Sequence, residues 1–310
     1  MLVQRTLKRM VSMKGTGLHS GQPVTVQLVP APAGNGIVFQ RTDLEGQPVI
    51  PAAYDRVVDT RLCTTLGMGE VRVATIEHLM SALYGVGVDN VQVRVDGPEI
   101  PILDGSSQPW IQAILEAGTR RQQRCRRLMV VRRAVTVRDG DAWARFEPSS
   151  RFRISARVDY DHPLISRHLF TFDFSELDFV QKIASARTFA FKREVEALRS
   201  MGLALGGSLD NAIVVDDFSI LNPDGLRFVD EFVRHKVLDA IGDVALAGEK
   251  LVGHLVLHRS GHALNNQLLY AVFADARNYR LVSTERQSAL PAHGVELPEA
   301  QTGLPTAVGA

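Results

Sequence analysis

The stretch EFVRHKVLDAIGD covers residues 231–243 and carries the strongest structural signal in this sequence. Apolar residues recur within it at three- and four-residue intervals, which is typical of a helix with one buried face. His235 and Asp239 are four residues apart, so on a helix both side chains point to one spot. Asp243 lies one turn further along the same stripe. We expect a long helix over residues 230–247. A stripe of carboxylates beside a histidine is usually a solvated helix face, but this one shares its helix with Val237, Leu238, Ile241 and Val244, so it could also hold a metal ion.

A second stretch repeats this arrangement in the first half of the chain. Glu77-His78 opens a helix that we predict over residues 75–84, with Thr75 as its N-cap. Gly85 follows His78 by seven residues, as Gly242 follows His235. Each helix leads to a strand and each strand to a further helix, at near-equal spacing in both halves. The sequence therefore favours an α+β protein built from two related units that face each other.

Alternation of apolar and polar residues predicts strands through most of the first hundred residues. Turn signals separate them, and the segments on either side of Gly67-Met68-Gly69 are typical of a small hairpin. A helix is expected over residues 107–117. In the second half we expect strands over residues 128–137, 142–147, 152–160, 169–174, 212–215 and 251–258, and helices over 193–200 and after Gly261.

The composition restricts the class of protein. Thirty-five Lys and Arg against 34 Asp and Glu leave a net charge of +1 in 310 residues. This balance argues against a protein that mainly coats nucleic acid or an anionic membrane. The sequence has no apolar run near the ~20 residues of a transmembrane helix and no signal-peptide core. Two cysteines, Cys63 and Cys125, form no metal or redox motif and suit a reducing compartment. We expect a cytoplasmic protein.

A cluster of seven arginines between residues 120 and 133 interrupts this balance. It could contact acidic lipid or nucleic acid. It could also be the solvated face of a linker that runs into the next strand. We favour the linker because the charge is balanced elsewhere and no nucleic-acid-binding motif is present.

Three residues could hold a metal ion. An imidazole from His235 and a carboxylate from Asp239 suit a divalent cation such as zinc, and His78 could be the third ligand. Three protein ligands and a water molecule are the usual arrangement of catalytic zinc. Glu77 would then lie close enough to that water to accept its proton, as in motifs that place a ligand and a base side by side.

His262 follows a Ser-Gly turn and precedes an apolar helix. It could be a surface or capping residue, or a general acid that donates a proton to a leaving amine. Asp243, if it lies nearby, could hold His262 protonated. Lys236 offers a positive charge for a phosphate or an oxyanion.

Eight ordered motifs resemble the family of UDP-3-O-acyl-N-acetylglucosamine deacetylases, the zinc amidases that commit Gram-negative bacteria to lipid A synthesis. They run from the N-terminus to about residue 275. The motifs are GLHSG (17–21), TIEHL (75–79), PILDGS (101–106), ARTF (186–189), LGGS (205–208), DEFVRHK (230–236), LDAIGD (238–243) and SGHALNN (260–266).

The resemblance implies two α+β domains of similar topology, each a layer of strands packed on helices, with the active site between them. The expected division is an N-terminal domain over 1–125 with a hairpin insert near 59–73, and a C-terminal domain over 126–295. An insert near 187–215 would form a passage for the acyl chain, and 296–310 would be a disordered tail. A monomer is expected.

The resemblance also implies roles for single residues. Zinc would be held by His78, His235 and Asp239, with Glu77 as general base. His262 would be the general acid with Asp243 behind it, and Thr188 would stabilise the oxyanion. The substrate, UDP-3-O-(3-hydroxyacyl)-N-acetylglucosamine, would be contacted by Lys236 at its phosphates, by Tyr160 at uracil, and by Leu18, His19, Leu62, Phe189, Phe191, Val195, Gly207 and Ala212.

Some points stay open at this stage. Phe191 and Val195 would line one side of a helix, but such a stripe is also typical of ordinary core. Ala190 stands where the family usually has Gly, and Ala142 where some relatives carry Lys. Iron can occupy similar nitrogen and oxygen sites. A hydrolase of another N-acyl sugar or amide, with the same metal residues, is the main alternative.

Overall fold

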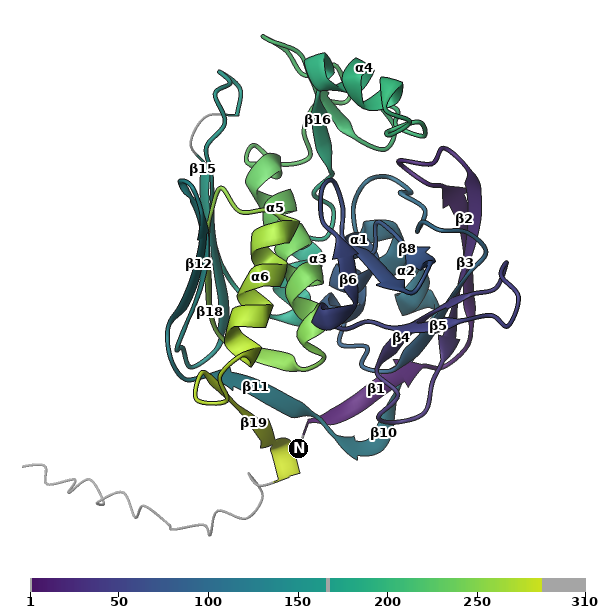
Figure 1. Cartoon of the computed structure of the whole chain (residues 1–310), viewed down its shortest axis with the longest axis vertical. Helices are drawn as coiled ribbons and strands as arrows, with labels where there is room; N and C mark the ends of the chain where they lie inside the picture. The colour runs from purple at the N-terminus through teal and green to yellow at the C-terminus, as the bar shows by residue number, and fades with distance from the viewer. Residues whose placement is uncertain (1, 166–167, 286–310) are drawn as a thin grey trace, which may run out of the picture.

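Two strands with alternating burial lie inside the two large sheets: β9 (Val91–Val95) and β18 (Lys250–His258). Every second residue of each strand is buried, so one face of each sheet packs on the core. The computed structural model describes residues 2–165 and 168–285. Figure 1 shows helices α5, α6, α1 and α2 between the two sheets. This arrangement confirms the α+β class.

The first sheet has the order β2-β3-β9-β4-β5. Its central strand β9 pairs antiparallel with β3 and parallel with β4. The flanking pairs, β2 with β3 and β4 with β5, are antiparallel. The bounds are β2 Val11–Thr16, β3 Pro23–Pro30, β4 Ile37–Arg41 and β5 Val49–Pro51.

The second sheet repeats this pattern around β18. This strand pairs antiparallel with β13 and parallel with β14, and β12 and β15 lie outside them as antiparallel partners. β11 also pairs parallel with β18 and antiparallel with β19. The bounds are β11 Arg127–Val131, β12 Val135–Asp139, β13 Ala142–Glu147, β14 Phe152–Val158, β15 His168–Asp173 and β19 Tyr279–Ser283.

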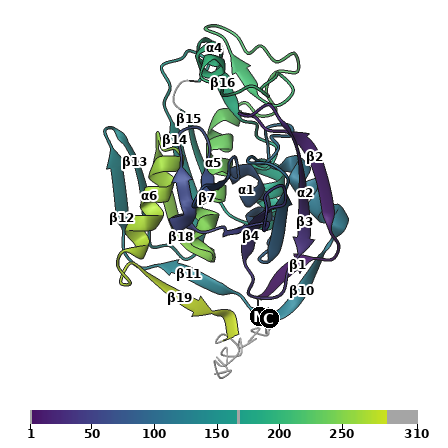
Figure 2. The same ribbon diagram turned by 45° about the vertical axis from the view of Figure 1, so that its right-hand side comes forward.

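The helices follow the same repeat. α1 (Glu77–Gly85) and α5 (Glu231–Val244) precede the central strands, and α2 (Gln108–Ala117) and α6 (His262–Phe273) follow them. α2 packs near β2 as α6 packs near β12, while α1 packs on α5. The predicted similarity of the two halves is therefore confirmed in strand order, strand direction and helix placement. Figure 2 shows α1 and α5 side by side in the middle of the molecule.

The two repeated glycines allow close approach between elements. A Cβ on Gly242 would lie 2.1 Å from the carbonyl oxygen of Glu77, so the first turn of α1 rests directly on α5. A Cβ on Gly85 would lie 2.1 Å from the ring of Phe179 in α3 (Glu176–Lys182). Both distances are shorter than any real carbon contact. Both glycines therefore mark positions of close packing, against different partners.

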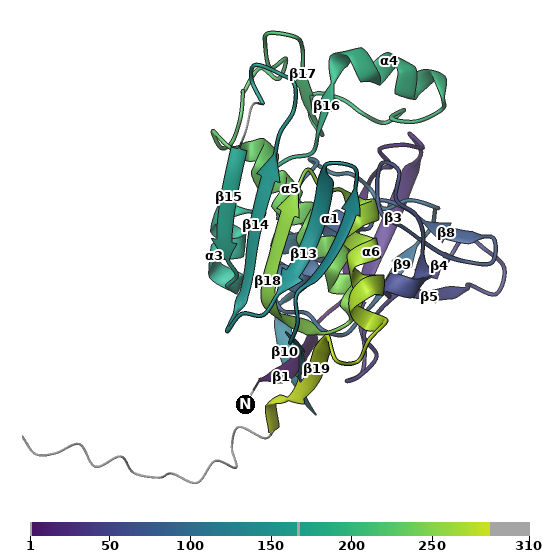
Figure 3. The same cartoon turned by 60° about the vertical axis from the view of Figure 1, so that its left-hand side comes forward.

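An insertion enters each half at the same point, between the last strand of the sheet and the first central helix. In the first half it contains η1 (Tyr54–Arg56) and the small sheet β6 (Val57–Asp59), β7 (Thr65–Met68) and β8 (Val71–Val73). In the second half it contains α3 and then β16 (Phe189–Phe191), α4 (Lys192–Ser200) and β17 (Ile213–Val215). Figure 3 shows β16, β17 and α4 together at one end of the molecule.

Several local predictions were wrong. Thr75 does not cap α1: its φ is +59° and its hydroxyl donates to Glu99 at 3.1 Å, so Ile76 takes the N-cap position. The expected strand over 128–137 is two strands, β11 and β12. By contrast, the long helix expected over 230–247 is confirmed as α5, with a short 3-10 turn, η2 (Ala245–Ala247), as its last part. Helix α3 was not predicted.

The arginine cluster joins the two halves, as expected of a linker, but most of it is β-strand. Its first part is β10 (Thr119–Cys125), which pairs antiparallel with β1 (Val3–Leu7), and its second part begins β11. The pairing of backbone groups holds these residues in strands despite their charge.

Two sequence predictions concern the whole chain. Both cysteines are free and buried. In the part of the chain that the structure describes, no helix is long and apolar enough to cross a membrane. The predicted tail over 296–310 lies outside the described residues, and the domain boundary at 125/126 stays a prediction.

Candidate metal centre and active site

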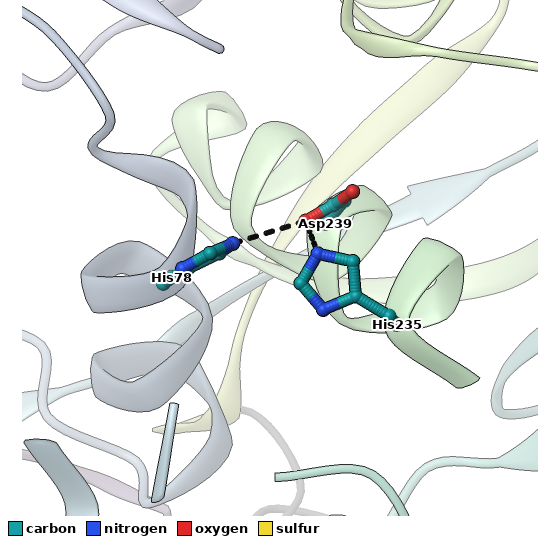
Figure 4. A group of neighbouring side chains, drawn as sticks. All are labelled: His78, His235 and Asp239. Atoms are coloured by element: carbon teal, nitrogen blue, oxygen red, sulfur yellow. Dashed lines mark ion pairs between the residues drawn. The ribbon is translucent and has the colours of Figure 1, made fainter. Parts of the chain in front are cut away.

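Three side chains that the sequence pointed to lie together between α1 and α5. His78 is in the first turn of α1, and His235 and Asp239 are one turn apart on α5. The Nε2 atoms of His235 and His78 lie 3.2 and 3.5 Å from Asp239 Oδ1 (Figure 4). One nitrogen or oxygen atom from each residue lies within 4.8 Å of the others, and all three residues are buried. This group could hold a metal ion.

The hydrogen bonds around these atoms fit a cation. Asp239 Oδ1 is buried and makes no well-aligned hydrogen bond, although both imidazoles face it. His235 Nδ1 is 3.0 Å from the carbonyl oxygen of Ala186, to which it can donate, leaving the lone pair of Nε2 free toward Asp239. Burial lowers the pKa of His235, which favours the neutral ring that a metal requires. The three residues direct electron pairs at one spot, with no proton to bridge them. Such a group suits a cation.

Lys236 adds a fixed charge beside this group. Its Nζ donates to Asp239 Oδ2 at 3.0 Å. Burial opposes the charged form, but Asp239 outweighs it and the pKa of Lys236 is raised. Burial likewise acts to raise the pKa of Asp239, but His235 and Lys236 reverse that effect and hold it well below its usual range. The carboxylate therefore stays ionised.

Glu77, the residue before His78, points its carboxylate toward the same cavity. Oε2 of Glu77 accepts a hydrogen bond from the backbone N–H of Thr64 at 3.0 Å. Burial raises the pKa of Glu77 to about 7. A carboxylate with that pKa can both accept and release a proton near neutral pH.

His262 begins α6 and lies opposite Glu77. Its Nδ1 is 2.9 Å from Asp243 Oδ2, which also accepts from Asn265 Nδ2 at 2.8 Å. Burial acts to lower the pKa of His262, but Asp243 and then Glu77 outweigh it and raise the pKa to about 9. The imidazole is therefore protonated at neutral pH, with Asp243 fixing its orientation.

Sequence reasoning missed Thr64, which links the two carboxylates. Its backbone N–H binds Glu77, and its hydroxyl donates to Asp243 Oδ1 at 2.6 Å. Thr64 lies just before β7 in the insertion of the first half, where no spacing or charge pattern marks it. Only the packing of that insertion against α1 reveals its position.

Glu99 was also missed. Its carboxylate accepts from the backbone N–H groups of His19 and Ser20 at 2.8 and 2.9 Å and from the Thr75 hydroxyl. It thereby ties the glycine-rich loop to the segment before α1. His19 lines the cavity, and both ring nitrogens are buried without a hydrogen-bond partner. Burial lowers the pKa of His19, although Glu99 acts to raise it.

A cavity of about 370 Å³ surrounds the group. All of the expected metal and proton-transfer residues line it except Asp243, which lies behind His262. The other expected substrate residues in its lining are Leu18, His19, Leu62, Tyr160, Thr188, Phe189, Phe191 and Lys236. Tyr160 meets Phe189 and Phe191 edge to face, with ring centroids 5.7 and 5.6 Å apart.

A second, more apolar cavity of about 290 Å³ adjoins it. The two share Leu18, His19, Leu62, Thr188, Phe189 and Ala190 in their linings. Beyond these, the insertion of the second half supplies seven apolar or glycine residues and three polar ones: Val195, Leu198, Ala204, Gly207, Leu209, Ala212 and Val214, with Lys192, Arg199 and Ser208. Apolar walls formed by α4 and the segment after it suit a hydrocarbon chain.

The expectation that Phe191 and Val195 line one side of a helix was wrong. Phe191 ends strand β16 and is buried with Ile213 and Phe232, while Val195 is on α4 and lines the apolar cavity. The strand ends before the helix begins, so helical spacing does not relate the two. Of the two departures from the family pattern, Ala190 lines both cavities and Ala142 lines neither.

Fold and site together define a class of protein. Two imidazoles and a carboxylate converge in a cavity beside a second carboxylate and a protonated imidazole, and this set of groups could hold a metal ion in a hydrolase. The chain belongs to the UDP-3-O-acyl N-acetylglycosamine deacetylase family, whose family model matches residues 4–274.

Individual relatives agree with this assignment. The chain is 55% identical to the UDP-3-O-acyl-N-acetylglucosamine deacetylase of Myxococcus xanthus, over 92% of this chain and 90% of that protein. It is 51% and 49% identical to the proteins of the same name from Anaeromyxobacter sp. and Pasteurella multocida, in both cases over 96% of this chain and 98% of the relative. The resemblance found in the sequence motifs is confirmed.

Proposed function

We propose that this protein removes the N-acetyl group of a UDP-3-O-acyl-N-acetylglucosamine by hydrolysis, releasing acetate and a free amine, as a step of lipid A biosynthesis in the cytoplasm. The observation that carries the proposal is the convergence of His78, His235 and Asp239 in a cavity that adjoins an apolar one. The first feature suits amide hydrolysis, and the second suits an acyl chain on the same substrate.

The metal residues would be His78, His235 and Asp239, and the ion would be zinc. Two nitrogens and one oxygen with a fourth position open are typical of catalytic zinc. When bound there, the ion polarises a carbonyl group and makes a water molecule more acidic. The hydrogen bond from His235 to Ala186 fixes the ring for that role.

Glu77 would accept a proton from the attacking water. Its carboxylate is next to the metal residue His78 in the chain, and Thr64 holds one of its oxygens, which leaves the other free to face the cavity. Because burial raises its pKa to about 7, the proton can later be passed on.

His262 would donate a proton to the leaving nitrogen. Its Nδ1 is bound to Asp243, so Nε2 carries the proton that can reach a substrate. A pKa of about 9 keeps this group charged at neutral pH. Thr188, in the lining of both cavities, would stabilise the oxyanion.

The substrate would lie across the two cavities. Its acyl chain would occupy the apolar cavity, in contact with Val195, Ala212 and Gly207. Lys236 would contact the phosphates and Tyr160 the uracil ring. His19, whose ring nitrogens are without a partner, would bind substrate at the junction.

The test is an acetate-release assay that compares the acylated nucleotide sugar with UDP-N-acetylglucosamine, with and without a chelator. We expect acetate release only from the acylated substrate at an appreciable rate, and its loss on chelation. Equal rates on both substrates would favour a hydrolase of another N-acyl sugar. Full activity of a metal-free preparation would overturn the proposal.

A further inference from the structure

A third cavity, which we call the seam cavity, lies where the two halves meet at the end of the molecule opposite α4. Its volume is about 240 Å³. Met80 and Tyr84 of α1 line it from the first half, and Ala245 after α5 lines it from the second. Strands β10 and β11 run between the two halves (Figures 1 and 2), and Arg124 of β10 and Arg127 of β11 line the cavity. It shares no lining residue with the candidate active site.

Charged residues dominate one wall of the seam cavity. They are Asp89, Arg124, Arg126, Arg127, Glu249 and Lys250. Part of this charge is matched. Arg126 donates to Asp89 at 2.9 Å, and Arg5 donates to Glu176 at 2.7 Å. Arg127 forms an ion pair with Glu249.

Two cations remain without a carboxylate of their own. Among the described residues, neither Arg124 nor Lys250 forms an ion pair. Lys250 Nζ donates to the carbonyl oxygen of Tyr84 at 2.6 Å and lies 3.6 Å from the centre of that ring. The guanidinium of Arg124 packs over Gly34, where a Cβ would be 1.9 Å from Nη1. Arg5 and Glu176 also act on Lys250, although they do not line the cavity. With them included, there are five cations (Arg5, Arg124, Arg126, Arg127 and Lys250) and three carboxylates (Asp89, Glu176 and Glu249).

The half-buried ammonium of Lys250 is the more unusual of the two. Burial lowers the pKa of Lys250 to about 7. The nearby charges act in both directions: Asp89 and Glu176 act to raise this pKa, and Arg126 and Arg5 act to lower it. Glu249 does not offset it, because that carboxylate is bound to Arg127. A lysine in such a position lacks a compensating negative charge.

We propose that the seam cavity binds a small dianion of the phosphate class, with Arg124 and Lys250 as its principal contacts. When Lys250 is protonated, the surplus is two positive charges, which matches a dianion. Guanidinium groups bind phosphate oxygens through paired hydrogen bonds, and a lysine adds a point charge. The volume is below that of pockets for drug-sized ligands, so the bound group is small: inorganic phosphate or the head of a phosphate monoester.

Occupancy would tie the halves together. The seam cavity is bordered by α1 and by the end of α5, the two helices that bring His78 and Asp239 together. A ligand that binds only the folded state raises its stability. Phosphate should therefore raise the melting temperature of the protein in a saturable manner.

The test is a calorimetric titration with inorganic phosphate, at constant ionic strength maintained with sodium chloride. We expect one saturable site in the seam cavity, and about tenfold weaker binding in Arg124→Gln, the loss of one charge-assisted contact. Arg121→Gln is the matched control, because Arg121 is an exposed arginine of the same strand and does not line the cavity. Binding to that variant should be unchanged.

Two further variants distinguish the seam cavity from the active site. Lys250→Met, whose fold is checked by circular dichroism, should also weaken binding by tenfold or more. Lys236→Gln, which alters the expected phosphate contact of the active site, should leave the seam site unchanged. Absence of saturable binding, equal weakening by Arg124→Gln and Arg121→Gln, or loss of the site in Lys236→Gln would each overturn the proposal.

Discussion

The two halves of the molecule share strand order, strand direction and helix placement, yet they contribute differently to the site. The first half supplies Glu77 and His78 from the start of α1. The second supplies His235, Asp239 and Asp243 from three successive turns of α5, and His262 from α6. The repeated fold brings two helices face to face, and the chemistry depends on the residues in which the halves differ.

The insertions differ in the same way. Both enter between the last sheet strand and the first central helix, but the first is a small sheet that brings Thr64 to Glu77 and Asp243. The second carries α4 and most of the apolar cavity. One insertion orients the polar residues, and the other forms the wall against which an acyl chain would lie.

The largest effect is expected where the halves differ most in chemistry. Glu77→Ala should lower kcat about 10²- to 10⁴-fold, because the general base is lost. The metal residues on α5 are unchanged, so the metal content should stay the same. Steady-state kinetics with metal analysis checks both. Glu70→Ala, which removes an exposed carboxylate of the neighbouring hairpin, is the control. Its kcat and its metal content should both match those of the wild type.

Gly242 and Gly85 allow a direct comparison of the repeat. Gly242→Ala should cost about 3 kcal/mol of folding free energy and reduce activity, because its Cβ meets backbone at Glu77. Gly85→Ala should cost about 1–2 kcal/mol and leave kcat nearly unchanged, because the ring of Phe179 can move aside. Denaturant unfolding and kcat measure the two effects. Equal loss of activity in both variants would contradict the asymmetry.

The Asp243–His262 pair has no counterpart in the first half, and pH tests it. His262 must be protonated to act as an acid, and its pKa is raised to about 9, so activity should fall as pH rises through about 9. Asp243→Asn removes the main cause of the increase, so this alkaline limb should move to lower pH. A pH–rate profile whose alkaline limb is unchanged in the variant would remove the pair from the reaction.

The raised pKa of His262 also affects the stability of the folded state. Because the folded pKa of His262 exceeds the unfolded value of about 6.5, the pair stabilises the folded state fully below that pH. The contribution is lost as pH rises through about 9. The difference in unfolding free energy between the wild type and Asp243→Asn should therefore become smaller as pH rises through this range. A constant difference would contradict this coupling.

The smallest effect is expected at the junction of the two cavities. Ala190→Gly removes one methyl group from the shared lining and should change KM for an acylated substrate by no more than about threefold. Ala142→Gly, in a residue outside both linings, is the control. A large change of kcat in Ala190→Gly would show that this position does more than shape the passage.

Much of the fold could be predicted because its signals are local. Apolar spacing predicted α5, alternation predicted β3 and β9, and the shared interval from histidine to glycine revealed the repeat. Predictions failed where distant contacts decide. Glu99 draws the Thr75 hydroxyl away from a cap, and pairing with β1 turns the arginines into strand β10.

The site residues, too, were predicted where the signal is local and missed where distant contacts decide. His235 and Asp239 were found from a four-residue interval, and His78 joined them through its place in the repeat and the family motifs. Thr64 was not found, because its two hydrogen bonds span 13 and 179 residues of sequence. Phe191 was placed on a helix because residue spacing does not show where strand β16 ends.

Metal content of purified His78→Ala, measured by mass spectrometry beside the wild type, tests most directly whether α1 and α5 jointly hold one ion. We expect one zinc ion per chain in the wild type and a much reduced content in the variant, with its fold intact by circular dichroism. A variant that keeps a full equivalent of zinc would show that α1 takes no part in the metal centre.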